Sequence, residues 1–412
     1  MKPIDAADVR RALLARVEIA LIDVRDEAAF ASGHPLFAVQ IPSDRLALEL
    51  PIRVPRRDAL CVLYAGGDDE AAAAAREMAA LGYSDVRLLA GGLSGWQAAG
   101  YELFSDVNSY CKAFGELVEA RRHTPSLPPE QVRQLIEENA DVVVVDVRRP
   151  DEYRTMNIPG STNIPGAELV LRLPSLLTSA ETAVIVNCAG RTRSIIGTQS
   201  LLNAGLANPV YALRNGTIGW TLAGQALEHG STREIPEVAE TYCEKARAEA
   251  AAVAYRAGVR TIDMTVCNFL TQQSDRTTYL IDVRSADEYL ARHIPRFQHV
   301  PGGQFVQETD HHASVRGARV VLADDLGPRT LMSAAWLAQM GWEVYVLDAP
   351  TGAFTASGPD VAAPPPRSAT GRYRRPYEGT DNPAEAMQAY LDWEAGLVEQ
   401  LRRDATHGFF VI

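Results

Sequence analysis

The chain has 412 residues, of which 47% are hydrophobic and 22% charged, so its length and composition predict two to four ordinary globular domains. Its formal net charge of −12 argues against nucleic acid as a partner, and no apolar run is long enough for a membrane span. The N-terminal residues lack the apolar segment of a secretory signal, and the five scattered cysteines lack CxxC spacing, which favours reduced thiols in a cytoplasm over disulfides or a zinc site.

One pattern occurs three times along the chain. It starts with an apolar strand that ends in Asp-Val-Arg, at 21–25, 144–148 and 280–284. An acidic-aromatic step follows each copy, and then a proline turn with a short second strand at 40–42, 163–165 and 299–301. Repetition of this kind predicts three copies of one module.

The second half of each copy repeats as well. A further strand, a loop and an Ala/Leu-rich helix lead to a helix-ending glycine, at Gly82, Gly205 and Gly341. A valine-rich strand follows, at 86–89, 210–213 and 344–347, and the first two copies close with Gly-x-x-Gly-Trp at 92–96 and 216–220. Short apolar strands alternating with longer helices predict an α/β fold of three tandem modules, each a mainly parallel sheet with helices on both faces.

These landmarks divide the chain into modules joined by helical linkers. We expect module one at 1–104, a linker at 105–127, module two at 128–229, a linker at 230–258, module three at 259–356, and a Pro-rich linker with a C-terminal helix at 357–412. Cys111 and Cys243 take matching places in the two linkers and are read as structural positions. Ala389–Asp392 begins a third linker-like helix. The sequence leaves open whether a fourth module once followed or the tail packs against the third.

The residues after the apolar run 183–186 carry the chemistry. Cys188 stands at the expected strand end, and the loop Ala189-Gly190-Arg191-Thr192-Arg193 leads into a helix-like stretch. Loop amides, the start of the next helix and two arginines would all favour thiolate over thiol, so we expect Cys188 to titrate below the roughly 8.5 of a free cysteine. The same loop would hold an oxyanion or a terminal persulfide sulfur.

Alignment on the helix-ending glycines shows which copy has this equipment. Cys188 corresponds to Ala65 in module one and to Asp324 in module three. Module one places three acids in its loop, and module three has the pair Asp324-Asp325, which we read as helix caps in preference to a metal site or base. Cys61 falls inside a strand and is expected in the core. The sequence therefore predicts that only module two is catalytic.

Taken together, these motifs resemble the rhodanese (sulfurtransferase) family over nearly all of residues 10–350. The resemblance rests on Asp-Val-Arg, the Asp-Glu-Tyr step, Ile158-Pro159-Gly160, the Cys-x-Gly-x-x-Arg loop and the Gly-x-x-Gly-Trp ending. It implies that Cys188 takes a sulfane sulfur from thiosulfate or a similar small donor as a persulfide, and passes it to cyanide, a thiol or a partner protein.

The resemblance also assigns roles to the loop. Arg193 would bind the donor's sulfonate, and Arg191 would add positive electrostatic potential and help to recognise the donor. The amides of Ala189, Gly190 and Thr192 would help to stabilise the persulfide. Arg148 is expected to pair with Glu152, and Arg214 is expected to be exposed, although it could lie at the mouth of the site. Two departures from the family pattern, Met156-Asn157 and Asn215 before Gly216, affect specificity more than activity.

Two other functions stay open at this point. A Cys-dependent phosphatase or arsenate reductase would need five residues between cysteine and arginine, whereas four separate Cys188 from Arg193. A non-catalytic scaffold that docks partners is the alternative from another class. No cofactor or metal is expected, and His311 and His312 are read as exposed residues of the polar loop 308–314.

Overall fold

The computed structural model describes residues 2–233, 238, 240–359, 367 and 370–412. In these ranges the strands form three separate sheets, each with five strands. Every strand pairing is parallel, and the three sheets share one connectivity: β1-β5-β4-β2-β3, β6-β10-β9-β7-β8 and β11-β15-β14-β12-β13. The prediction of three tandem parallel α/β modules is therefore confirmed.

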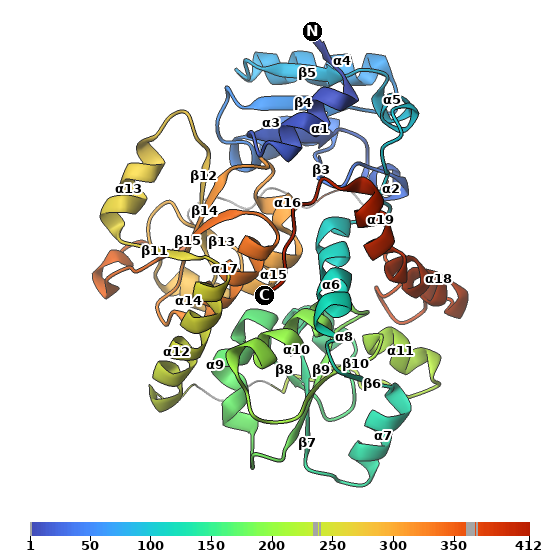
Figure 1. Cartoon of the computed structure of the whole chain (residues 1–412), viewed down its shortest axis with the longest axis vertical. Coiled ribbons are helices and arrows are strands. Elements are labelled where there is room, and N and C mark those ends of the chain that lie inside the picture. Colours follow the sequence, from blue (N-terminus) through green and yellow to red (C-terminus); the bar gives the residue numbers. More distant parts are fainter. Residues whose placement is uncertain (1, 234–237, 239, 360–366, 368–369) are drawn as a thin grey trace.

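Module one, coloured blue in Figure 1, contains the first sheet. Its strands are β1 (Lys2–Ile4), β2 (Ile19–Asp23), β3 (Ala38–Gln40), β4 (Leu60–Tyr64) and β5 (Val86–Leu89). Its helices are α1 (Ala6–Leu14), α2 (Glu27–Ser32), the 3-10 turn η1 (Ser43–Arg45), α3 (Leu46–Arg53), α4 (Asp68–Ala80) and α5 (Gly92–Ala98). Cys61 lies in β4 with no exposed surface, so the prediction that it belongs to the core is confirmed.

Module two repeats this arrangement. Its strands are β6 (Ser126–Leu127), β7 (Val142–Asp146), β8 (Thr162–Asn163), β9 (Ala183–Asn187) and β10 (Val210–Leu213). Its helices are α7 (Pro129–Glu137), α8 (Pro150–Thr155), η2 (Gly166–Glu168), α9 (Leu169–Arg172), η3 (Leu173–Leu176), α10 (Thr192–Ala204) and α11 (Gly216–Leu222). The predicted helix-ending Gly205 follows α10 with φ +89°, a left-handed conformation that suits glycine.

Module three follows the same plan. Its strands are β11 (Arg260–Ile262), β12 (Thr278–Asp282), β13 (Gln298–His299), β14 (Arg319–Ala323) and β15 (Glu343–Leu347). Its helices are α13 (Met264–Gln272), α14 (Ala286–Ala291), α15 (Gly302–Gln307), α16 (Thr309–His312), α17 (Pro328–Gln339) and η4 (Thr351–Ala353). Ser285 and Glu288 form a capping box at the start of α14, and Glu152 takes the same place in α8, which explains the acidic step in modules two and three.

Four of the described helices belong to none of the three modules: α6 (Ser109–Arg122), α12 (Glu240–Arg256), α18 (Ala384–Ala395) and α19 (Leu397–Asp404). The first, second and third expected linker helices are thus α6, α12 and α18. Helix α6 runs through the middle of the molecule, and α18 and α19 lie beside it (Figure 1). The C-terminal residues reach module three, where Ile412 N donates to Gln339 Oε1 at 3.0 Å. The tail therefore packs against α6 as well as against module three.

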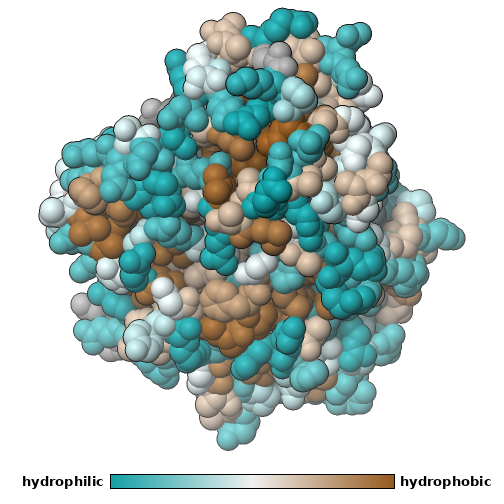
Figure 2. Space-filling model, turned by 45° about the horizontal axis from the view of Figure 1, so that its top comes forward, coloured by the Kyte–Doolittle hydropathy of each residue, from teal (hydrophilic) through white to brown (hydrophobic). Residues whose placement is uncertain are grey.

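The modules share buried contacts instead of standing apart. A single apolar core cluster contains side chains from all three modules. Trp336 of module three donates to Ser200 of module two at 2.8 Å, and the backbone N–H of Thr277 donates to Glu18 of module one at 2.7 Å. Figure 2 shows hydrophilic side chains over most of the visible face, with apolar patches between them. Among the described helices none combines the length and apolarity that a bilayer crossing needs.

Candidate active site

The cysteine of module two lies at the carboxyl end of a central strand, which is where parallel sheets usually carry their functional residues. Strand β9 ends at Asn187, Cys188 follows, and α10 begins at Thr192. Helix α11 holds the loop from the other side: Thr217 N–H donates to Cys188 O at 2.9 Å and Ile218 N–H to Ala189 O at 3.0 Å. These bonds bind the first loop carbonyls to α11, so those carbonyls are not free to face the sulfur.

Glycine is required at the start of α11 because the loop approaches closely. Gly216 has φ +56°, and a β-carbon there would lie 2.4 Å from Cys188 O and 2.6 Å from Gly190 O. The preceding Asn215 also has a left-handed backbone, with φ +61°, which asparagine tolerates better than most residues. Its Oδ1 accepts a hydrogen bond from Arg191 at 3.1 Å. The departure from paired glycines therefore keeps the backbone path and adds a partner for Arg191.

The Cys188 thiol is enclosed, with only 1% of the residue exposed. It donates to Ser194 Oγ at 3.5 Å. Burial raises the pKa of Cys188 above its ordinary value, although the charge on Arg193 and hydrogen bonds with Ser194 act in the opposite direction. The expectation of a lowered pKa in an accessible loop is therefore wrong, because desolvation outweighs the positive charge.

Both loop arginines are bound to carboxylates. Arg193 makes two hydrogen bonds to Glu152 of α8, at 2.8 and 2.9 Å. Arg191 makes two to Glu116 of α6, at 2.7 and 2.8 Å, and also pairs with Glu119. Three carboxylates thus face two guanidinium groups, so the loop is far less positive than its sequence suggests.

The predicted pairing of Arg148 with Glu152 is wrong. Arg148 bonds instead to Asp146, at 2.9 Å through Nε and 2.8 Å through Nη2, and to the carbonyl of Met156. The i,i+4 rule applies within a helix, but Arg148 precedes α8, which begins at Pro150. Glu152 is left for Arg193, and although burial opposes ionisation, that guanidinium lowers the pKa of Glu152 to about 2.

Helix α18, near the C-terminus, covers the loop. Nothing in the sequence of the loop itself indicates this contact. A β-carbon on Gly190 would lie 3.1 Å from Tyr390 Cε1 and 3.3 Å from Glu394 Oε2. Helix α6 closes another side, since a β-carbon on Gly115 would come within 2.7 Å of Thr192 Cγ2. The site is thus assembled from module two, the first linker and the C-terminal tail.

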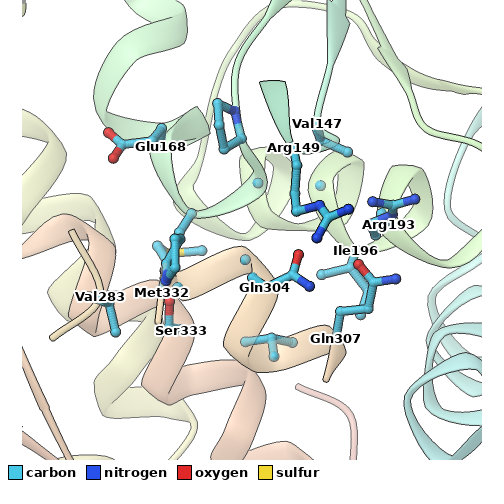
Figure 3. A pocket seen from close by; sticks show the side chains of 18 of the residues that line it. Val147, Arg149, Glu168, Arg193, Ile196, Val283, Gln304, Gln307, Met332 and Ser333 are labelled. Atoms are coloured by element: carbon cyan, nitrogen blue, oxygen red, sulfur yellow. The ribbon is translucent and has the colours of Figure 1, made fainter. Parts of the chain in front are cut away.

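A cavity of about 310 Å³ lies between modules two and three (Figure 3). Corresponding segments of both modules line it, at 147 and 149–151 and at 283–286, at 165–168 and 301–304, and on helices α10 and α17, where Met332, Ser333 and Trp336 contribute from α17. Arg193 and Thr192 belong to its wall, whereas Cys188 is not among the described residues that line it. The cavity therefore reaches the loop's arginine without reaching the sulfur.

Neither of the other two modules has a cysteine at the position of Cys188, although module three keeps part of the surrounding arrangement. In module three, Arg329 pairs with Glu288 at 2.7 Å, as Arg193 does with Glu152. Asp324 accepts hydrogen bonds from the N–H groups of Gly327 and Thr330, so it caps the start of α17 as predicted. In module one, Ala65 holds the corresponding place. Module one has the acid Glu70 where Arg193 stands. The ion pair is thus shared by modules two and three, and its presence does not by itself mark a reactive copy.

The remaining candidate residues are placed as follows. Arg214 is exposed and bonds to Ser126, at 3.2 Å through Nε. His311 and His312 lie in α16 and are partly buried, so the expectation of an exposed loop is wrong. Burial lowers the pKa of His312 to about 4. Within the described ranges, no cluster of His, Cys, Asp and Glu is suited to hold a metal ion.

The fold is a tandem of three parallel α/β modules, and module two alone has a cysteine directly after its central strand β9, where Ala65 and Asp324 stand in the other two. The Rhodanese-like domain family matches residues 5–99, 128–223 and 268–355, and the chain therefore belongs to that family.

Two similar proteins illustrate the range of the family. The chain is 47% identical to a thiosulfate sulfurtransferase from Pseudomonas aeruginosa, whose crystal structure superposes with a TM-score of 0.97 and full coverage of both chains. It is also 32% identical over 94 residues to the HTH-type transcriptional regulator Rv0324 of Mycobacterium tuberculosis. That match covers 23% of this chain and 41% of the regulator's own length. The full-length likeness to an enzyme supports enzymatic activity here, whereas the short one concerns one module.

Sequence reasoning singled out the loop after Cys188 but did not place four residues that the structure brings to it. Ser194 follows the motif directly and could have been found as a hydroxyl on the first turn of the helix. Glu116, Glu152 and Glu394 come from three other elements, and only the recurring acidic step gave any signal, for Glu152.

Proposed function

We propose that the protein is a sulfurtransferase that moves a sulfane sulfur from thiosulfate or a similar donor to a thiophilic acceptor through a persulfide on Cys188. The observation that carries this proposal is the placement of Cys188 at the end of β9, inside a loop bound to α11 and followed at once by the first turn of α10. The full-length likeness to the thiosulfate sulfurtransferase of Pseudomonas aeruginosa supports the choice of donor.

The reaction takes two steps. The Cys188 thiolate attacks the outer sulfur of thiosulfate, a new S–S bond forms, and the S–S bond of thiosulfate breaks as sulfite leaves with its electron pair. The acceptor then attacks the terminal sulfur of the persulfide, and the Cys188 thiolate leaves. Cyanide, a small thiol or a protein thiol would each serve as acceptor.

The loop residues divide the work in this proposal. The amides of Ala189, Gly190 and Thr192 are the donors nearest to the sulfur along the chain, and they would stabilise the anionic persulfide. Arg193 and Arg191 would orient the donor's charged oxygens from within their ion pairs, because a guanidinium keeps donors free when a carboxylate occupies one of its edges. The buried state of Cys188 means that side chains over the loop, Tyr390 among them, must shift when the donor enters.

Turnover with different substrates tests the proposal. Wild-type protein given thiosulfate and cyanide should release thiocyanate and sulfite in equal amounts, and Cys188→Ser should release neither. Cys61→Ser is the matched control, because that thiol is equally buried but lies in β4 of module one. Hydrolysis of a phosphate ester or reduction of arsenate without thiocyanate formation would place the protein in the rival enzyme class, and inactivity in every assay would favour a scaffold.

A further inference from the structure

Helix α18 places the buried carboxyl group of Glu394 against the loop that follows Cys188. Glu394 has no exposed surface, and its Oε2 lies 3.3 Å from the position a β-carbon would take on Gly190. Its Oε1 lies 3.4 Å from Thr192 Oγ1, which donates to it. Gly190 and Thr192 both belong to the loop after Cys188, so this carboxyl faces the place where an anion would bind.

The two oxygens of Glu394 have different surroundings. Oε1 accepts from Thr192 and also from Tyr390 OH at 2.8 Å. Oε2 is buried and has no hydrogen-bond partner among the described residues. An ionised carboxylate with a buried, unsatisfied oxygen is costly, whereas a neutral acid carries its proton on that oxygen and becomes a donor.

The nearest cation, Lys112, does little to hold Glu394 in its ionised form. Lys112 of α6 is near, but its ammonium bonds to Asp106 at 2.8 Å and lies 5.0 to 5.5 Å from the ring centres of three aromatic side chains, Tyr377, Tyr390 and Trp393. Much of its charge is therefore already matched by Asp106 and by the ring faces.

The other groups that face Glu394 come from α6, the loop and α18 itself. Burial, with the charge of Glu116 adding to it, raises the pKa of Glu394 to about 8, although Lys112, Arg191 and the Tyr390 hydroxyl lower it. The neutral acid is then the main form at neutral pH. Ionisation would also act against Cys188, since a charge on Glu394 raises the pKa of that thiol.

We propose that Glu394 works as a neutral carboxylic acid that donates a hydrogen bond from Oε2 to the charged oxygens of the sulfur donor bound at the Cys188 loop. The proposal rests on the proposed function and names a binding group for its first substrate. A neutral acid suits this place because it offers a donor without a charge that would repel the dianionic donor. The C-terminal tail thereby contributes directly to a site that otherwise belongs to module two.

The test compares the pH dependence of sulfur loading in variants at this position. Wild-type protein should load sulfur from thiosulfate with a bell-shaped profile, rising as Cys188 loses its proton and falling as Glu394 loses its own. Glu394→Gln keeps an N–H donor of the same shape that does not ionise. Its rate should stay close to wild type near neutral pH and should not fall at high pH, so the ratio of its rate to the wild-type rate rises about tenfold or more between about pH 7 and about pH 10.

Glu394→Leu removes the donor and should slow loading at and below neutral pH, where the wild-type acid is neutral, and Glu385→Gln on the exposed first turn of α18 should leave the profile unchanged. A second readout is thiosulfate binding to the Cys188→Ser protein by titration calorimetry, which needs no transfer step. Affinity should fall at high pH in that protein and stay constant when Glu394→Gln is added. An unchanged alkaline fall in Glu394→Gln, or wild-type loading in Glu394→Leu, would overturn the proposal. Failure of wild-type protein to load sulfur while binding still shows the Glu394 dependence would overturn the transfer reaction alone.

Discussion

Gly216 offers a direct test of how tightly the reactive loop is held. Gly216→Ala forces a left-handed backbone on a residue with a side chain, which costs about 1–2 kcal/mol. It also places a methyl group 2.4 Å from Cys188 O and 2.6 Å from Gly190 O, and overpacking of this kind costs about 1–3 kcal/mol. Together the change should destabilise the protein by about 2–5 kcal/mol and displace the loop that holds the nucleophile.

Gly224→Ala is the matched control, because Gly224 also has positive φ, +71°, but its β-carbon would have nothing within 4 Å. Urea unfolding of both variants separates the cost of the left-handed backbone from the cost of the steric clash. The free energy of unfolding of Gly224→Ala should fall by about 1–2 kcal/mol, and this variant should keep wild-type sulfur loading. Gly216→Ala should lose more stability and at least about tenfold in loading rate, since small displacements of a reacting group have effects of this size. Equal stability and equal loading in the two variants would refute the claim that α11 positions the loop.

Two further predictions concern the protonation of Glu152 and of Cys188. Because the pKa of Glu152 is depressed from 4.5 to about 2, its ion pair stabilises the fold above about pH 4.5 and is lost as the pH falls toward 2, an effect worth about 3 kcal/mol. Glu152→Gln should therefore lose less stability than wild type between pH 5 and pH 3 in urea titrations, whereas Glu137→Gln, in an exposed pair with Arg133, should follow wild type. Cys188 should react with iodoacetamide more slowly than free glutathione at neutral pH and should gain rate only as the pH rises past the pKa of an ordinary thiol, because burial raises the pKa of Cys188. Rapid alkylation at pH 6 would contradict this reasoning.

The fold was largely predictable because the same local signals occur three times. The valine-rich strand β7, the acidic capping step and the glycines that end helices are each decided by residues within a few positions of one another. Three repetitions then made parallel sheets the simplest arrangement. The same repetition aligns Cys188 with Ala65 and Asp324, and on this alignment module two is the proposed catalytic copy.

The electrostatics of the site were not predictable, because they depend on residues far away in the sequence. Arg191 is paired with carboxylates of the linker helix α6, and Glu394 reaches the loop from about 200 residues downstream. The sequence of the loop shows only two positive charges, whereas the folded structure pairs them with three carboxylates and covers the loop with helix α18. The sign of the Cys188 pKa shift followed from that burial, which local sequence does not record.

The central claim is that Cys188 carries sulfur as a persulfide, and intact mass measurement after brief exposure to thiosulfate tests it most directly. The account predicts a gain of about one sulfur atom in wild-type protein, its loss on addition of cyanide, and no gain in Cys188→Ser. The Cys61→Ser protein should behave as wild type. A sulfur adduct that survives in Cys188→Ser, or no adduct in wild-type protein at any pH, would contradict it.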